Sequence, residues 1–138
     1  MTRDVRTVSL DNSLQSAAQI MSELDCGFLP VARDDRLIGI VTDRDIAVRG
    51  VARGLGADAG IETVMSDEVC YCFEDQDADE VLVNMGDIQV RRMPVVDQDK
   101  RLVGVVSFTN LASNGEAPRA GETLGDIARP SGLHSQSV

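Results

Sequence analysis

The sequence predicts an α+β fold built from two copies of one small unit. The copies are marked by two matching stretches, residues 39–47 (GIVTDRDIA) and 104–112 (GVVSFTNLA). Each stretch has a glycine, two β-branched apolar residues, a hydroxyl and, three residues after the hydroxyl, Asp or Asn. The apolar pair is typical of a buried strand end, and the hydroxyl with the later Asp is typical of a helix start. Each copy therefore predicts a strand that leads directly into a helix.

The residues before these stretches repeat as well. At an offset of 64 residues both copies place apolar residues on one stripe of an amphipathic helix, at i, i+3, i+4, i+7 and i+10: Leu14, Ala17, Ala18, Met21 and Leu24, then Ala78, Val81, Leu82, Met85 and Ile88. Residues 30–31 fall on 94–95 at the same offset. One extra residue in the second turn moves 37–39 onto 102–104, and turns tolerate such insertions. We interpret the pattern as an internal duplication.

Each repeat reads strand, helix, strand, turn, strand, helix. The first repeat, residues 1–53, predicts a strand at 5–8, a helix capped by Asp11 or Ser13 that runs to about Leu24 and ends at Cys26-Gly27, strands at 28–32 and 37–41, and a closing helix at 43–53. Residues 54–64 form a small-residue linker with a short helical turn. The second repeat, residues 65–113, predicts a strand at 69–73, a helix at 77–88, strands at 92–96 and 101–106, and a helix from Phe108.

One repeat has too little core to stand alone, so we expect the two to pack sheet to sheet about a pseudo-two-fold axis. The tail, residues 114–138, is rich in Gly and Ser and is expected to be flexible at its end. Within it, residues 122–129 resemble the helical turn that leads into the second repeat. We expect this tail turn to dock where the first repeat lacks such a lead-in.

Composition and charge argue against several classes of partner. The chain has 13 Lys and Arg against 23 Asp and Glu, a formal charge of −10, which disfavours nucleic acid and anionic membranes as main partners. Aromatic residues make up only 3% of the chain, so platforms for stacking bases are not expected. No apolar run is long enough to span a bilayer and no leader pattern opens the chain, so we expect a cytoplasmic protein.

These features together resemble a tandem pair of cystathionine-β-synthase (CBS) domains, the adenosine-nucleotide-sensing Bateman module. The resemblance covers about residues 1–113 and rests on the helix stripe, on the strands Gly27-Phe-Leu-Pro-Val31 and Arg92-Met-Pro-Val95, and on the signature that contains Thr42-Asp-Arg-Asp45. It implies βαββα units, a cleft between them with two related ligand positions, and a homodimer shaped as a flat disc. The sequence contains no added enzyme or channel domain, so a stand-alone module is expected.

The first ligand position is expected at the turn around Thr42 and Asp45. A carboxylate at Asp45 accepts both hydroxyls of a ribose, and Thr42 stands at a helix N-terminus whose unpaired N–H groups favour phosphate. Arg44 or Arg49 supplies positive charge. By family analogy alone, the slot for the base is lined by residues from two further segments: Thr7, Val8, Phe28, Leu29 and Pro30.

The second position departs from this pattern. Ser107 keeps the hydroxyl, but Asn110 replaces the carboxylate, and a neutral bond in place of a charge-assisted one costs on the order of 1 kcal/mol. The cation next to the turn is missing too, so Arg91 or Arg92 is the candidate replacement. By analogy Met93 and Pro94 line this second position. We expect the Thr42/Asp45 position to bind more tightly.

Each of these features also has a purely structural interpretation. Residues 42–45 form a capping box that needs no ligand. The acidic run 74–80 is expected to favour the start of a helix rather than to hold calcium. Cys70 and Cys72 alternate on a predicted strand and share a face, so buried inert thiols are favoured over a zinc site with Cys26 and His134, and a disulfide from Cys26 to one of them stays open.

Two functions remain after this reading, and neither is enzymatic. The sequence has no nucleophile–base pair and no glycine-rich phosphate loop after a strand, so catalysis is not expected. The first function is a regulatory module that binds AMP, ATP or a related adenosine compound, with no other cofactor and no metal, and acts on an unknown protein partner. The alternative is a structural or interaction protein that keeps the homodimeric scaffold without binding a nucleotide.

Overall fold

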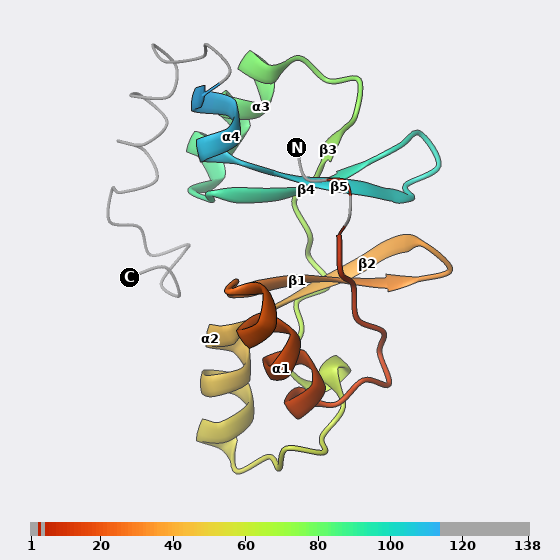
Figure 1. Cartoon of the computed structure of the whole chain (residues 1–138), viewed down its shortest axis with the longest axis vertical. Coiled ribbons are helices and arrows are strands. Elements are labelled where there is room, and N and C mark those ends of the chain that lie inside the picture. The colour runs from red at the N-terminus through yellow and green to blue at the C-terminus, as the bar shows by residue number, and fades with distance from the viewer. Residues whose placement is uncertain (1–2, 4, 114–138) are drawn as a thin grey trace. The chain divides into compact units, whose positions relative to one another are not determined.

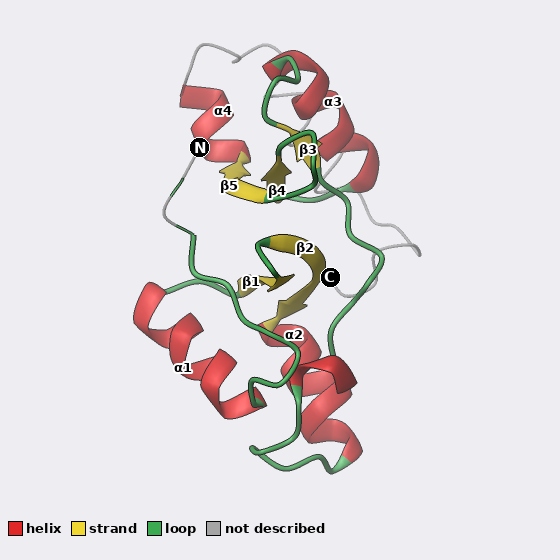
Figure 2. Cartoon of the chain, turned by 90° about the vertical axis from the view of Figure 1, so that its right-hand side faces the viewer, coloured by secondary structure: helices red, strands yellow, loops and turns green. Residues whose placement is uncertain are grey.

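The computed structural model describes residues 3 and 5–113, and its described elements fall into two compact units (Figure 1). The N-terminal unit comprises Arg6–Val69 and Asp99–Leu102, and the C-terminal unit comprises Cys70–Gln98 with Val5 and the described residues from Val103 onward. In each unit helices cover one face of a small sheet, the α+β arrangement that the duplication predicted (Figure 2). The predicted tail turn at 122–129 lies outside the described residues.

The N-terminal unit is organised around an antiparallel hairpin. Strand β1 (Phe28–Arg33) pairs with β2 (Arg36–Thr42) from Phe28 opposite Thr42 to Arg33 opposite Arg36. The two turn residues, Asp34 and Asp35, both have positive φ, 52° and 66°. Two-residue hairpin turns need positive φ so that their backbone twist matches that of the strands they join. The predicted strand at 5–8 is wrong in extent, because only Val8 forms a bridge, parallel to Val31. Val8 N donates to Pro30 O, and Ala32 N donates to Val8 O.

Helix α1 (Leu14–Leu24) begins and ends where the sequence predicted. Ser13 is its N-cap and accepts a hydrogen bond from Ser16 N. The helix stops at Leu24, as predicted, but the residue that ends it is Asp25, in the left-handed conformation with φ 51°, rather than Cys26-Gly27. Glycine is the usual residue there, and the only nearby glycine stands two positions too late to take that role.

The closing helix of the N-terminal unit changes type along its length. The predicted segment 43–53 is helical throughout, but it divides into α2 (Asp43–Asp45), a π-helical segment (Ile46–Gly50) and a 3-10 turn (Val51–Arg53). The widened turn ends at Gly50, where an added Cβ would lie 3.0 Å from Cδ1 of Leu14 on α1. Such π turns inside helices often mark functional sites. A second 3-10 turn, Ile61–Thr63, then leads out of the unit.

The C-terminal unit repeats this plan with a three-stranded sheet. Its strands are β3 (Cys72–Phe73), β4 (Arg92–Val96) and β5 (Leu102–Ser107), in the order β3-β4-β5, and its helices are α3 (Ala78–Ile88) and α4 (Phe108–Ser113). Strand β3 runs parallel to β4 with Cys72 opposite Val95, the counterpart of the Val8–Val31 bridge. The strand predicted at 69–73 is therefore only two residues long.

The duplication is visible in individual hydrogen bonds. Gln89, which lies 64 residues after Asp25, ends α3 with φ 58°. Val90 N donates to Met85 O at 3.0 Å, just as Cys26 N donates to Met21 O at 3.0 Å. Each unit has its own apolar core, and these cores contain most of the predicted stripe residues: Leu14, Ala17 and Met21 in one, Val81, Leu82 and Met85 in the other. Among the described helices, none is long and apolar enough to cross a membrane.

The left-handed residue at the end of α1 generates the first prediction. Replacing Asp25, whose φ is 51°, with glycine is expected to raise the free energy of unfolding by about 0.5–1 kcal/mol, because glycine adopts positive φ without steric cost. The matched control is Asp87→Gly near the end of α3, which removes the same charge from helical backbone and is expected to destabilise. Denaturant unfolding measures both. Equal effects of the two variants would contradict the prediction.

Candidate functional site

The hairpin of the N-terminal unit brings together three predicted segments that lie far apart in the sequence. Thr42, the last residue of β2, pairs with Phe28, the first residue of β1, and Val8 lies beside β1. The side chains of Val8, Leu29 and Pro30 are buried, whereas Phe28 is partly buried and Thr7 is exposed. The side chains of the three buried residues therefore pack inside the unit, and a ligand next to them would contact their backbone atoms.

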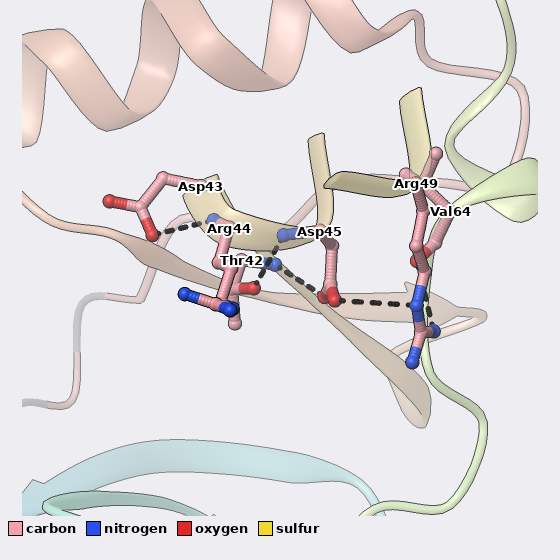
Figure 3. A network of polar contacts seen from close by, with 6 residues as sticks. All are labelled: Thr42, Asp43, Arg44, Asp45, Arg49 and Val64. Carbon is pink, nitrogen blue, oxygen red and sulfur yellow. Dashed lines mark hydrogen bonds and ion pairs between the residues drawn. The ribbon is translucent and has the colours of Figure 1, made fainter. Parts of the chain in front are cut away.

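Thr42 and Asp45 form the capping box that the sequence predicted as one interpretation. Thr42 Oγ1 accepts from Asp45 N at 3.0 Å, and Asp45 Oδ2 accepts from Thr42 N at 3.0 Å (Figure 3). Asp45 is only 3% exposed, the one charged residue classed as buried in the described part of the chain. A buried carboxylate requires hydrogen bonds and a countercharge. The box supplies a hydrogen bond, and the countercharge comes from Arg49.

Arg49 faces Asp45 rather than an open phosphate position. Its Nε lies 3.9 Å from Asp45 Oδ1, and its Nη1 donates to Val64 O at 3.5 Å (Figure 3). Arg44, the other predicted cation, is exposed, and only its backbone N–H bonds within this turn, to Asp43 Oδ1 at 2.8 Å. Of the two arginines, Arg44 is therefore the one whose guanidinium faces solvent.

The backbone N–H groups at this helix start were predicted to be unpaired and available to a phosphate. In the structure they are already hydrogen-bonded. Asp43 N donates to Gly27 O, Arg44 N to Asp43 Oδ1 and Asp45 N to Thr42 Oγ1. The expectation of unpaired donors at this helix start is wrong, because Gly27, before β1, and two side chains of the turn accept from them. The missed signal is the pair Gly27 and Asp43: a Cβ on Gly27 would lie 2.7 Å from Asp43 Oδ2.

The second predicted position follows the same backbone plan with different chemistry. Phe108 N donates to Arg91 O at 2.7 Å, the counterpart of the bond from Asp43 N to Gly27 O. Phe108 packs against the core of the C-terminal unit, and no carboxylate stands at this position. Ser107 is partly buried, and the side chain of Asn110 lies outside the described part. Arg91 and Arg92 are exposed, whereas Met93 and Pro94 are buried.

The cysteines differ from the prediction in two respects, the shared strand face and the burial of Cys70. Cys70 and Cys72 do not share a strand face, because β3 begins only at Cys72; Cys70 is exposed and Cys72 is 3% exposed. Cys26 is partly buried, and its Sγ donates to Phe28 O at 3.5 Å. All three thiols are free, and His134 lies outside the described residues. Within the described ranges, no three His, Cys, Asp or Glu residues are grouped as a metal site would need.

The acidic run lies at the start of a helix, as the structural interpretation proposed. Asp79 and Glu80 occupy the first turn of α3, where negative charge is favoured by the helix dipole. The N-cap residue, Asp77, makes no side-chain capping bond. The run therefore contributes charge near the helix N-terminus rather than a hydrogen-bonded cap.

Fold and repeat together define a pair of CBS domains, and comparison with known proteins agrees. The CBS domain family model matches residues 1–50 and 61–115, so the chain belongs to the CBS-domain family. It is 38% identical over 114 residues to the CBS domain-containing protein YhcV of Bacillus subtilis, covering 83% of this chain and 81% of that protein. It is 39% identical over 114 residues to Hypoxic response protein 1 of Mycobacterium tuberculosis, covering 81% and 79%.

Solved structures show the same architecture. The crystal structure of Hypoxic Response Protein I with two coordinated zinc ions matches with a TM-score of 0.74 at 39% identity, covering 83% of this chain and 94% of that one. The CBS domain pair of protein MJ0100, in complex with 5′-methylthioadenosine and S-adenosyl-L-methionine, matches with a TM-score of 0.69 at 29% identity, covering 82% and 92%. These neighbours confirm the tandem CBS assignment and the α+β fold.

The contrast between Cys70 and Cys72 generates a prediction about thiol reactivity. Burial raises the pKa of the Cys72 thiol from 9.0 to about 11, so it stays protonated at pH 8, and only the thiolate reacts. With a disulfide reagent at pH 8, exposed Cys70 is expected to be modified well before Cys72. Peptide mass mapping measures the order, and Cys70→Ser is the control that should remove the fast phase. A fast phase on Cys72 would contradict the assignment.

Proposed function

We propose that this chain is a non-enzymatic regulatory module whose N-terminal unit binds an adenosine compound, AMP, ATP or a relative, at the Thr42/Asp45 turn. One observation carries the proposal: the hairpin gathers Val8, residues 28–30 and Thr42 beside a buried carboxylate. Support comes from the MJ0100 pair, a member of the same family, whose structure holds two adenosine compounds. The ligand then acts by changing how the module engages a protein partner.

The proposed ligand contacts use the hydrogen-bonding groups of Asp45 and Thr42 that the capping box does not occupy. A carboxylate has about four lone-pair sites, and the box and the 3.9 Å contact with Arg49 do not use all of them, so Asp45 keeps lone pairs that can accept ribose hydroxyls. The Thr42 hydroxyl accepts from Asp45 N and keeps its own hydrogen to donate. Exposed Arg44 is the cation for phosphate, in place of the helix N–H groups that are already bonded.

The second candidate is a scaffold that binds no nucleotide, and one observation favours it. Asp45 is buried and bonded within its own turn, so the Thr42/Asp45 signature is fully accounted for as a helix start. Under this function the geometry of the capping box serves only to join β2 to the closing helix. The two candidates differ in whether any adenosine compound stabilises the fold.

A thermal-shift panel of AMP, ADP, ATP, S-adenosylmethionine and NAD tests the proposal. A ligand present at 100 times its dissociation constant adds about 2.7 kcal/mol to the free energy of unfolding, and the melting temperature rises accordingly. Guanosine and inorganic phosphate serve as controls for the base and for the anion. A shift with adenosine compounds alone supports the regulatory module, and no shift with any of them favours the scaffold.

The two positions are expected to differ in affinity. Asp45→Asn keeps an acceptor for Thr42 N but removes the charge, so it is expected to weaken nucleotide binding by about tenfold. Asn110→Ala is expected to change the affinity of the tighter site by less than twofold, and Asp43→Asn, at an exposed neighbour, is the control. Isothermal titration calorimetry measures all three. A larger loss in Asn110→Ala would contradict the ranking.

We further propose that the chain forms a homodimer through helices of the N-terminal unit. Leu24 at the end of α1 is 46% exposed, Val48 in the π-helical segment 45% and Val51 in the 3-10 turn 69%. Helix α1 packs against the π-helical segment, so these apolar residues belong to neighbouring helices. Large exposed apolar groups on adjacent elements are typical of surfaces that pair, and a second copy of the same surface provides a matching apolar partner.

Sedimentation equilibrium tests this interface. The native chain is expected to sediment as a dimer, and Val51→Glu is expected to shift it toward monomer by at least tenfold in dissociation constant, because a charge would be buried in an apolar contact. Val51→Thr, which keeps the shape, is expected to have a much smaller effect. A monomeric native chain, or a dimer that Val51→Glu leaves unchanged, would overturn the proposal.

A further inference from the structure

Arg49 contacts two segments of the N-terminal unit at once. Its Nε lies 3.9 Å from the Oδ1 atom of Asp45, and its Nη1 donates to the carbonyl of Val64 at 3.5 Å (Figure 3). The guanidinium group carries its donors in a rigid planar fork, so different edges can face a carboxylate and a carbonyl together. Arg49 therefore joins the start of the closing helix to a segment that lies 15 residues further along the chain.

The segment on the far side of this bridge, residues 61–66, is the lead-out of the N-terminal unit. Val64 N and Met65 N both donate to Ile61 O at 3.0 Å, and Ser66 exchanges two hydrogen bonds of 2.9 Å with Ile40. Ile61 and Val64 are buried, at 0% and 1% exposure. The chain also passes close to β2, since a Cβ on Gly39 would lie 2.8 Å from Ser66 O. A change in the hydrogen bond from Arg49 to Val64 O therefore affects a closely packed segment.

We propose that Arg49 is a positioning residue that couples the negative charge and the contacts of Asp45 to segment 61–66. The buried carboxylate needs a countercharge, and Arg49 provides it while it also donates to Val64. A change that weakens or strengthens the ion pair between Asp45 and Arg49 therefore also changes the hydrogen bond from the guanidinium to Val64 O. The coupling is a property of the unliganded chain and does not depend on nucleotide binding; if a ligand engages Asp45, the same bridge carries its effect to the lead-out segment.

Amide hydrogen exchange of the full chain tests the coupling without any ligand. Asp45→Asn keeps the shape and the capping acceptor but removes the charge, and the hydrogen bonds and ion pair of Asp45 involve no residue of segment 61–66. It is expected to speed exchange of the Val64 and Met65 amides by about two- to fivefold, the range for a partly exposed ion pair. Arg49→Met is expected to do the same, and the double variant is expected to exchange no faster than Arg49→Met alone.

Two controls separate coupling from a general loss of stability. The Ala17 amide in α1, which bonds to Ser13 O at 3.1 Å, serves as an internal reference whose exchange is expected to stay unchanged. Arg53→Met removes an exposed arginine from the same helical segment and is expected to leave Val64 and Met65 unaffected. Arg49→Lys keeps the charge but replaces the planar fork with a single ammonium group, so it is expected to match Arg49→Met.

The outcomes that overturn the proposal are specific. The coupling is wrong if Asp45→Asn leaves exchange in segment 61–66 unchanged, or if the effects of Asp45→Asn and Arg49→Met multiply in the double variant. An Arg49→Lys variant that behaves like the native chain would show that charge alone matters and would remove the bridging role. Both Arg49 variants alter a partly exposed side chain, so they keep the test open even if Asp45→Asn fails to fold.

Discussion

The reciprocal hydrogen bonds between Thr42 and Asp45 are the interaction on which the N-terminal unit depends. They join the last residue of β2 to the first turn of the closing helix, so they set the direction in which that helix leaves the sheet. Because Asp45 is buried, the same bonds place a charge inside the unit and require an arginine to balance it. The strand end, the helix start and the position of Arg49 follow from one pair of side chains.

The two units show how a duplicated backbone carries divergent chemistry. Bonds such as Cys26 N to Met21 O and Val90 N to Met85 O recur at equal lengths, and they depend on backbone conformation rather than on side chains. The polar side chains at the junctions have changed: the first copy has a capping box, and the second has Phe108 against the core. A shared fold therefore does not imply two equivalent binding positions.

Apolar periodicity was enough to predict the repeat, the helices α1 and α3, and the strands β1, β2, β4 and β5, because one buried face imposes its spacing on the sequence. Apolar periodicity failed to predict the structure at positions where long-range packing determines the backbone conformation. The residues before Cys72 are apolar enough for a strand but find a ladder partner only from Cys72 onward. The π-helical segment ends at Gly50, which lies close to Leu14 of α1, and no local sequence pattern predicts that approach.

The candidate site was predictable in its residues and less so in its bonding. The sequence identified Thr42 and Asp45, but Asp43 and Gly27 were missed because their approach depends on how the hairpin folds. Their contact also constrains how the two copies can change. Arg91 stands where the first copy has Gly27, and Phe108 stands where it has Asp43, so neither difference is independent of the other. An aspartate introduced at 108 alone would stand opposite a side chain at 91 where the first copy has only hydrogen, so restoring the first copy's junction requires changes at both positions.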